Sequence, residues 1–126
     1  MATKNIAELA LEFGKSMAEM KNYLRQHIQG KIRQHNLNIT FELLEIMSLL
    51  WRKDGVNQQE LADIAVKDMS TMTYLIDNLV KRNLVTRVEH DIDRRNKLIF
   101  LTEEGKLLQK NYLPWQLKCM IKLLLK

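Results

Sequence analysis

The sequence is poor in the residues that build disulfide frameworks, tight turns and membrane spans. It has one cysteine, Cys119, one proline and four glycines among 126 residues. A single cysteine excludes an internal disulfide and suits a reducing compartment. No apolar run approaches membrane-spanning length, and no basic-then-apolar leader opens the chain. These absences predict a small, mostly helical cytoplasmic domain with no membrane partner.

The sequence motifs of enzymes are missing as well. The chain has no glycine-rich phosphate loop, no nucleophile motif and no histidine and cysteine set at metal-ligand spacing. His27 and His35 have no cysteine or carboxylate at ligand spacing. The adjacent carboxylates Glu103 and Glu104 fit the first turn of a helix, where they favour the helix dipole. We therefore expect no catalytic residues, no metal and no cofactor.

Positive charge is in excess. Lysine and arginine number 20 against 15 acidic residues, for a net charge of +5, and 46% of the residues are hydrophobic. A chain of this length and composition suffices for one domain with one core. The charge fits a nucleic acid or a membrane surface, although soluble proteins without either partner also reach it.

Residues from about Thr3 to His35 predict one long amphipathic helix. Its apolar residues recur at spacings of three and four: Ile6, Leu9, Ala10, Phe13, Met17, Met20, Leu24 and Ile28. At ~1.5 Å per residue, such a helix is too long to bury its whole stripe against the rest of the chain. We expect part of the stripe to contact a second subunit; the alternative is a helix that lies over its own domain.

Three shorter helices are expected to follow. Thr40 is a plausible N-cap for the first, which ends near Gly55, a residue suited to the left-handed stop. Asn57 and Glu60 predict a capping box for the second, and Asp68 can cap the third. The inward face of the short middle helix is expected to contain Leu61, Ile64 and Ala65.

The helix after Asp68 has an apolar and a polar side. At 100° per residue, the apolar side holds Met69, Met72, Leu75, Ile76 and Leu79. The polar side holds Lys67, Ser70, Thr71, Tyr74, Asp77, Asn78 and Lys81. Such side chains can donate to phosphates and base edges, whereas a solvated face more typically carries glutamate–lysine pairs. Phosphates would repel Asp77 unless it is paired, and Lys81 is a candidate partner. Asn83 is expected to end the helix in a left-handed conformation.

Two strands joined by a basic loop come next. Residues 84–90 and 97–101 are rich in β-branched and apolar residues with a strand-like alternation. The loop of residues 91–96 has neither glycine nor proline, so it is not a tight two-residue hairpin. Its tip is basic, with Arg94 and Arg95.

The C-terminal segment is apolar and contains the only proline. Thr102 is expected to cap a helix that runs to about Tyr112, where Pro114 ends or kinks it. Beyond it stand Trp115, Leu117, Met120, Ile121, Leu123, Leu124 and Leu125. An interface formed by the two termini explains this segment better than a membrane-surface helix does. Cys119, among apolar neighbours, is more typical of packing than of a redox switch.

This order of helices, strands and basic loop, from about Thr40 to Gly105, resembles the MarR family of bacterial transcriptional regulators (multiple antibiotic resistance regulators). Three stretches carry the resemblance: Gln59-Glu60-Leu61-Ala62; Ser70-Thr71-Met72-Thr73 with Leu75, Ile76, Asp77 and Leu79; and Asp93-Arg94-Arg95 followed by Lys97-Leu98-Ile99-Phe100-Leu101-Thr102-Glu103-Glu104-Gly105. The last is the most specific, because it joins an Asp-X-Arg turn to a Leu-Thr-X-X-Gly run.

The resemblance implies a mainly α fold with a small β-hairpin wing, a winged helix-turn-helix with long terminal dimerisation helices. One domain, 1–126, would contain a DNA-binding lobe of about 40–105 and dimerisation helices of about 1–36 and 106–126. The recognition helix would enter a major groove and the wing a minor groove. Arg95 would be the minor-groove arginine, Asp93 the acid that holds the wing arginines, and Arg94 and Lys97 phosphate contacts. The expected DNA-binding residues are Lys67, Ser70, Thr71, Thr73, Tyr74, Asn78, Lys81, Asp93, Arg94, Arg95 and Lys97; the expected dimerisation residues are Ile6, Leu9, Phe13, Met17, Trp115, Leu117, Ile121 and Leu124.

We therefore expect a sequence-specific regulator that binds double-stranded DNA as a homodimer on a pseudo-palindromic operator, and on family grounds a repressor. The alternative is a winged helix that binds only another protein, against which the basic wing argues. Tyr74 stands where many family members carry arginine, so base preference does not carry over. Asn83 stands where glycine is usual, which is a tolerable exchange. No residue set marks a pocket for a small-molecule effector, which stays unidentified.

Overall fold

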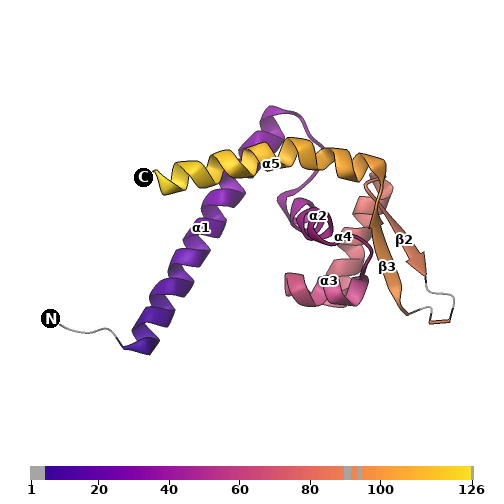
Figure 1. The fold of residues 1–126 in the computed structure, drawn as a ribbon, viewed down its shortest axis with the longest axis horizontal. Helices are drawn as coiled ribbons and strands as arrows, with labels where there is room; N and C mark the ends of the chain where they lie inside the picture. The colour runs from indigo at the N-terminus through magenta and orange to yellow at the C-terminus, as the bar shows by residue number, and fades with distance from the viewer. Residues whose placement is uncertain (1–4, 90–91, 94, 126) are drawn as a thin grey trace. The chain divides into compact units, whose positions relative to one another are not determined.

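The computed structural model describes residues 5–89, 92–93 and 95–125 of the chain. Its elements are α1 (Ile6–Gln34), α2 (Phe41–Arg52), β1 (Val56–Asn57), α3 (Gln58–Ala65), α4 (Met69–Lys81), β2 (Val85–Glu89), β3 (Lys97–Leu101) and α5 (Glu103–Leu124) (Figure 1). They belong to two compact units. One unit, Asn38–Pro114, is called here the central lobe, and the other, α1 with the chain from Trp115 onward, the terminal unit. The fold is mainly helical with one small sheet, as predicted.

Helix α1 confirms the long N-terminal helix. Asn5 caps it, because its side chain accepts a hydrogen bond from the Glu8 N–H at 2.8 Å. The helix starts at Ile6, and the expected start at Thr3 lies outside the described residues. The apolar stripe is exposed over its first half, with Phe13 67% exposed, and is buried towards its end at Ile28. The chain therefore leaves a long apolar strip of α1 open to solvent.

Helix α2 forms the centre of the central lobe. Thr40 caps it as predicted, with its Oγ1 accepting from the Leu43 N–H at 3.2 Å. Its buried residues are Phe41, Leu43, Leu44, Ile46, Met47 and Leu50. Because α2 is apolar on several sides, the other elements of the lobe can pack around it.

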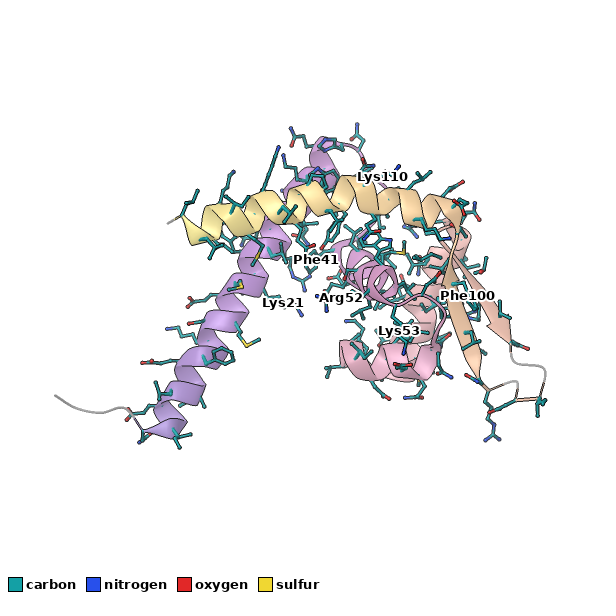
Figure 2. The ribbon with its side chains drawn as sticks, in the orientation of Figure 1. Lys21, Phe41, Arg52, Lys53, Phe100 and Lys110 are labelled. Carbon is teal, nitrogen blue, oxygen red and sulfur yellow. The ribbon has the colours of Figure 1, made fainter. Side chains whose placement is uncertain are left out.

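The turn after α2 differs from the prediction. The helix ends at Arg52, and the backbone of the capping residue Lys53 is extended; both residues are labelled in Figure 2. Gly55 has the expected positive φ of 68°, but it lies two residues past the cap and leads the chain into β1. Asp54 organises this turn, since its Oδ1 accepts from the N–H groups of Gly55 at 2.9 Å and Leu101 at 2.8 Å. A carboxylate bond to β3 therefore replaces the expected glycine stop.

The start of α3 contains half of the expected capping box. The Asn57 side chain accepts from the Gln59 N–H at 2.7 Å. The Glu60 carboxylate does not complete the box; it lies 3.6 Å from the Lys53 ammonium instead. The capping box is therefore wrong in its second partner, because a lysine at the end of α2 competes for the glutamate.

The predicted inward face of α3 is confirmed at Leu61 and wrong at Ile64. Leu61 is buried as predicted, but its buried companions are Gln58 and Ala62. Ile64 is 54% exposed, and Ala65 is half-buried. A helix turns about 100° per residue, so positions 58, 61, 62 and 65 share a face from which position 64 is rotated away.

The turn between α3 and α4 holds Val66 in a left-handed conformation. Its φ is 54° and its ψ is 51°, and the side chain is 90% exposed. A β-branched residue rarely adopts this conformation, which costs an L-residue roughly 1–2 kcal/mol. No burial of the Val66 side chain offsets that strain.

Val66→Gly is therefore expected to raise the free energy of unfolding by about 0.5–1 kcal/mol, because relief of strain exceeds the greater entropy that glycine loses on folding. Chemical denaturation measures the change. The matched control is Ile64→Gly, which places glycine inside α3 and is expected to lower stability by about 1 kcal/mol. Equal destabilisation by both substitutions would show that Val66 is not strained.

The sheet has three antiparallel strands in the order β1-β3-β2. The predicted hairpin is confirmed: β2 and β3 pair from Val85 opposite Leu101 to Glu89 opposite Lys97. The expected end of the first strand at His90 lies outside the described residues. The sequence reading missed β1, which pairs Val56 with Ile99. A two-residue strand has no periodicity to detect.

Helix α5 corrects the prediction for Pro114. Thr102 caps the helix as expected, its Oγ1 accepting from the Gly105 N–H at 3.1 Å. The helix does not end near Tyr112 but continues through Pro114 to Leu124. Proline removes one N–H, which deprives the carbonyl of Lys110 of its helical partner. Among the described residues, no helix is long and apolar enough to cross a bilayer.

Candidate nucleic-acid interface

Helix α4 presents a polar face with exposed hydroxyl groups. Asp68 caps it, with Oδ1 accepting from the Thr71 N–H at 2.7 Å, and this hydrogen bond lowers the pKa of the carboxyl. Ser70, Thr71 and Lys81 are exposed, and Tyr74 is 67% exposed. These side chains, predicted as DNA contacts, stand on one side of a helix that is anchored at its start.

The opposite side of α4 anchors the helix in the lobe. Met72, Leu75, Ile76 and Leu79 are buried, as predicted from the helical periodicity. Met69 is exposed, so its expected place in the core is wrong. It is the first residue of the helix, where no preceding turn covers it.

Two other predicted DNA contacts on α4 already have partners within the protein. Gln58, a buried residue of α3, donates from Nε2 to the Thr73 Oγ1 at 2.9 Å. The Asn78 amide donates to the Tyr74 carbonyl at 2.8 Å, and its oxygen accepts from Arg82 at 3.2 Å. Thr73 therefore helps to hold α4 against α3, and Asn78 bonds within α4 and its C-cap. Contact of either residue with DNA stays a prediction.

The partner of Asp77 is Arg87 of β2, not Lys81 as predicted. The Arg87 Nη2 lies 2.7 Å from the Asp77 Oδ1. Arg87 shares a face of β2 with the buried Val85, since alternate residues of a strand point the same way. The sequence reading missed Arg87, and its only signal was a charged residue in phase with an apolar strand position.

The wing loop is organised by Asp93. Its Oδ1 accepts from the Arg95 backbone N–H at 3.1 Å, and its carbonyl accepts from the Asn96 N–H at 3.0 Å. The family resemblance implied that Asp93 holds the wing arginines, and the structure shows it holding the backbone of Arg95. Arg95 is exposed and Lys97 is half-buried, while Arg94 lies outside the described residues.

The base of the wing is tied to the rest of the lobe. Asn57, at the start of α3, donates from its amide to the side-chain oxygen of Asn96. Asn83 is left-handed as predicted, with a φ of 59°, and its carbonyl accepts from the Thr102 hydroxyl at 2.7 Å. The Leu84 carbonyl accepts from the Thr102 N–H at 3.1 Å. These bonds set the positions of both hairpin strands relative to the helices.

The terminal unit contains the residues predicted for dimerisation. In the described chain Ile6, Leu9, Phe13, Met17, Leu117, Ile121 and Leu124 are exposed. Trp115 is half-buried against His35, with ring centroids 5.1 Å apart. Cys119 is buried, and burial raises the pKa of its thiol. A buried, protonated thiol is poorly suited to redox chemistry.

The described residues contain no group of three or more histidine, cysteine, aspartate or glutamate side chains that could hold a metal. An apolar hollow of about 380 Å³ lies in the terminal unit. It is lined by Ser16, Glu19, Met20, Tyr23, Met120, Leu123 and Leu124.

The anchored helix α4, the preceding α3 and the β2–β3 wing define the central lobe as a winged helix-turn-helix. The family model described as "MarR family" matches residues 39–97. The chain is 30% identical to the transcriptional regulator HosA of Escherichia coli O127:H6 over 94 residues, which are 73% of this chain and 67% of that protein. The chain belongs to the MarR family.

Further relatives in sequence and in structure agree with this family. An organic hydroperoxide resistance transcriptional regulator of Bacillus subtilis is 31% identical over 74 residues, 59% of this chain and 50% of that protein. The chain thus spans about half the length of that relative, and 61% of another Bacillus subtilis regulator. The crystal structure of a MarR transcriptional regulator from Methanosarcina mazei superposes with a TM-score of 0.80 at 29% identity, covering 89% of this chain and 79% of that one.

Proposed function

We propose that this protein is a sequence-specific transcriptional regulator that binds double-stranded DNA as a homodimer. The observation that carries the proposal is the exposed Ser70, Thr71 and Tyr74 face of α4 beside a wing that exposes Arg95. The helix would enter a major groove and the arginine an adjacent, narrow minor groove, where negative potential is concentrated. The transcriptional regulators among its relatives support this function.

The two compact units would divide the work within one winged-helix protein. The central lobe would contact DNA, and the terminal unit would join two copies through its exposed apolar residues. Two copies related by a two-fold axis require a pseudo-palindromic operator with half-sites about one helical turn apart. A dimer on such a site in a promoter would block transcription, so we propose a repressor that works in the cytoplasm. Repression by DNA binding requires no catalytic step.

Site selection from random DNA supplies the operator for the first test. On that operator, Arg95→Ala is expected to weaken binding by about 1–3 kcal/mol, since it removes a specific contact. Lys110→Ala is the control, because it removes one positive charge from an exposed position on α5 (Figure 2). Fluorescence anisotropy measures both affinities. Equal binding by the two variants would contradict the role of the wing arginine, and a selection without a pseudo-palindrome would contradict the dimeric operator.

The alternative of a winged helix that binds only another protein makes a different prediction. The basic wing and the hydroxyl-rich helix face suit phosphates and base edges, which argues against this alternative. A winged helix of that kind would show no enrichment of any DNA sequence in the same selection.

A further inference from the structure

One ion pair joins α4 to the strand that leads into the wing. The Arg87 Nη2 lies 2.7 Å from the Asp77 Oδ1, with side-chain exposures of 22% for Arg87 and 48% for Asp77. The Arg87 Nε is buried and has no hydrogen-bond partner. The guanidinium is therefore largely withdrawn from water, and Asp77 is its partner. The Asp77 carboxylate is half exposed, and its removal would leave a largely buried positive charge without a counter-ion.

Asp77 is in an unfavourable place for a DNA-binding protein unless it has a second role. It lies on the same helix as Ser70, Thr71 and Tyr74, which are expected to approach phosphates and bases. A carboxylate there repels the DNA backbone by simple electrostatics. Its bond to Arg87 neutralises the charge and fixes the distance from α4 to β2.

The hairpin is held from its other side as well. Strand β3 pairs with β1 through Asn57 opposite Leu98, and the Asn57 amide donates to Asn96 at the base of the wing loop. Besides the Thr102 bonds at its base, the hairpin thus has a tie to α3 through Asn57 and one to α4 through Arg87. Arg87 is two residues from the end of β2, close to where the wing loop begins.

We propose that Asp77 and Arg87 are positioning residues that fix the wing relative to helix α4, so that both can reach their grooves in one binding event. The inference rests on the proposed DNA-binding function. Without the pair, α4 and the wing are each intact and remain joined by the bonds of Asn57 and Thr102, but the tie between α4 and β2 near the start of the wing loop is lost, and ordering the wing on DNA costs entropy. The wing then makes fewer lasting contacts with the phosphates.

The sign of the effect of Asp77→Ala distinguishes this proposal from simple repulsion. Removal of a carboxylate near DNA should tighten binding if Asp77 only repels phosphates. The positioning role predicts weaker binding, by about two- to thirtyfold. Asp63→Ala, which removes an exposed carboxylate from α3, is the matched control and is expected to leave affinity unchanged or slightly higher.

A salt series separates positioning from loss of folded protein. A smaller active fraction lowers the apparent affinity at every salt concentration but leaves the log–log slope unchanged. Loss of wing contacts makes the slope shallower by ~0.9 for each phosphate released. Where alanine lowers the yield of folded protein, Asp77→Asn removes the same charge with less change in shape. An unchanged slope in the folded variant overturns the proposal.

A double-mutant cycle tests whether the two residues act together. If they act as a pair, Asp77→Ala with Arg87→Ala binds no more weakly than Arg87→Ala alone. If Arg87 contacts DNA and Asp77 repels it, the two single effects have opposite signs and add. Wild-type protein on the selected operator is the reference. No binding of the operator by the wild-type protein refutes the proposed function. If the wild-type protein binds tightly but the effects of the two substitutions add, or the Asp77 variants bind more tightly, only this inference is refuted.

Discussion

Gly105→Ala is expected to lower the free energy of unfolding by about 3 kcal/mol, a fall of roughly 10 °C in Tm. A Cβ at this position would lie 2.2 Å from the Leu84 carbonyl oxygen. That carbonyl is fixed backbone, because it accepts from the Thr102 N–H at 3.1 Å. The Gly105 carbonyl accepts from the Trp51 indole at 2.9 Å, so α5 cannot shift without losing a second bond.

The matched control for Gly105→Ala is Gly30→Ala in α1. A Cβ at Gly30 meets no atom within 4 Å, and alanine is favoured over glycine inside a helix by about 0.5–1 kcal/mol. The two Gly→Ala substitutions are therefore expected to change stability in opposite directions. Thermal and chemical denaturation at one fixed protein concentration measure both. A Gly105→Ala protein as stable as the wild type would show that α5 does not pack against Leu84 as described.

Phe13→Glu combined with Met17→Glu is expected to convert the dimer to a monomer and to weaken operator binding by about 10²- to 10⁴-fold. Both side chains are exposed on the apolar stripe of α1 and would face a second copy. Two carboxylates buried in such an interface have no partner and oppose association. A monomer contacts one half-site and loses the benefit of linked binding to the second.

Lys15→Glu is the control for the dimer test. Lys15 lies on the opposite side of α1, about 200° from Phe13 at 100° per residue. The substitution Lys15→Glu introduces the same acidic group outside the apolar stripe of α1. Size-exclusion chromatography with light scattering at micromolar concentration is expected to find a dimer for this variant and a monomer for the double variant. A wild-type monomer, or an unaffected double variant, would contradict the dimerisation surface.

Much of the fold could be predicted because many of its signals act within a few residues. The caps at Thr40, Asp68 and Thr102 each bond to an N–H three residues ahead, so the residue types alone indicate them. The left-handed conformation of Asn83 and the buried side of α4 are likewise indicated by residues close together in the sequence. Helical periodicity and capping chemistry therefore placed α1, α2 and α4 close to their observed positions.

The features that could not be predicted depend on contacts between distant parts of the chain. Arg87 became the partner of Asp77 because β2 passes α4, whereas Lys81 was favoured by helical spacing alone. Strand β1 exists because β3 supplies its hydrogen bonds. Pro114 is tolerated inside α5, although the local rule for proline predicts an end or a kink there. The first two features depend on tertiary contacts that no local rule contains.

The candidate site also combines features that nearby residues predict with features that depend on distant parts of the chain. The exposed residues of α4 followed from helix geometry, and the wing arginine Arg95 came from the family resemblance. The engagement of Thr73 by Gln58 required the position of the neighbouring helix α3, whereas Asn78 and Arg82 are only four residues apart. The polar face of α4 therefore contains a residue that holds the helix, Thr73, as well as exposed residues such as Ser70 and Thr71.

Titration of the wild-type protein on DNA across a salt series tests the central claim most directly. If two copies seat α4 and the wing on one operator, several phosphates are neutralised, and log affinity falls with log salt at ~0.9 per phosphate. We expect a slope of about −4 or steeper, with binding in the nanomolar range at low salt. A flat slope, or no binding at low salt, would contradict the claim that this protein is a DNA-binding regulator.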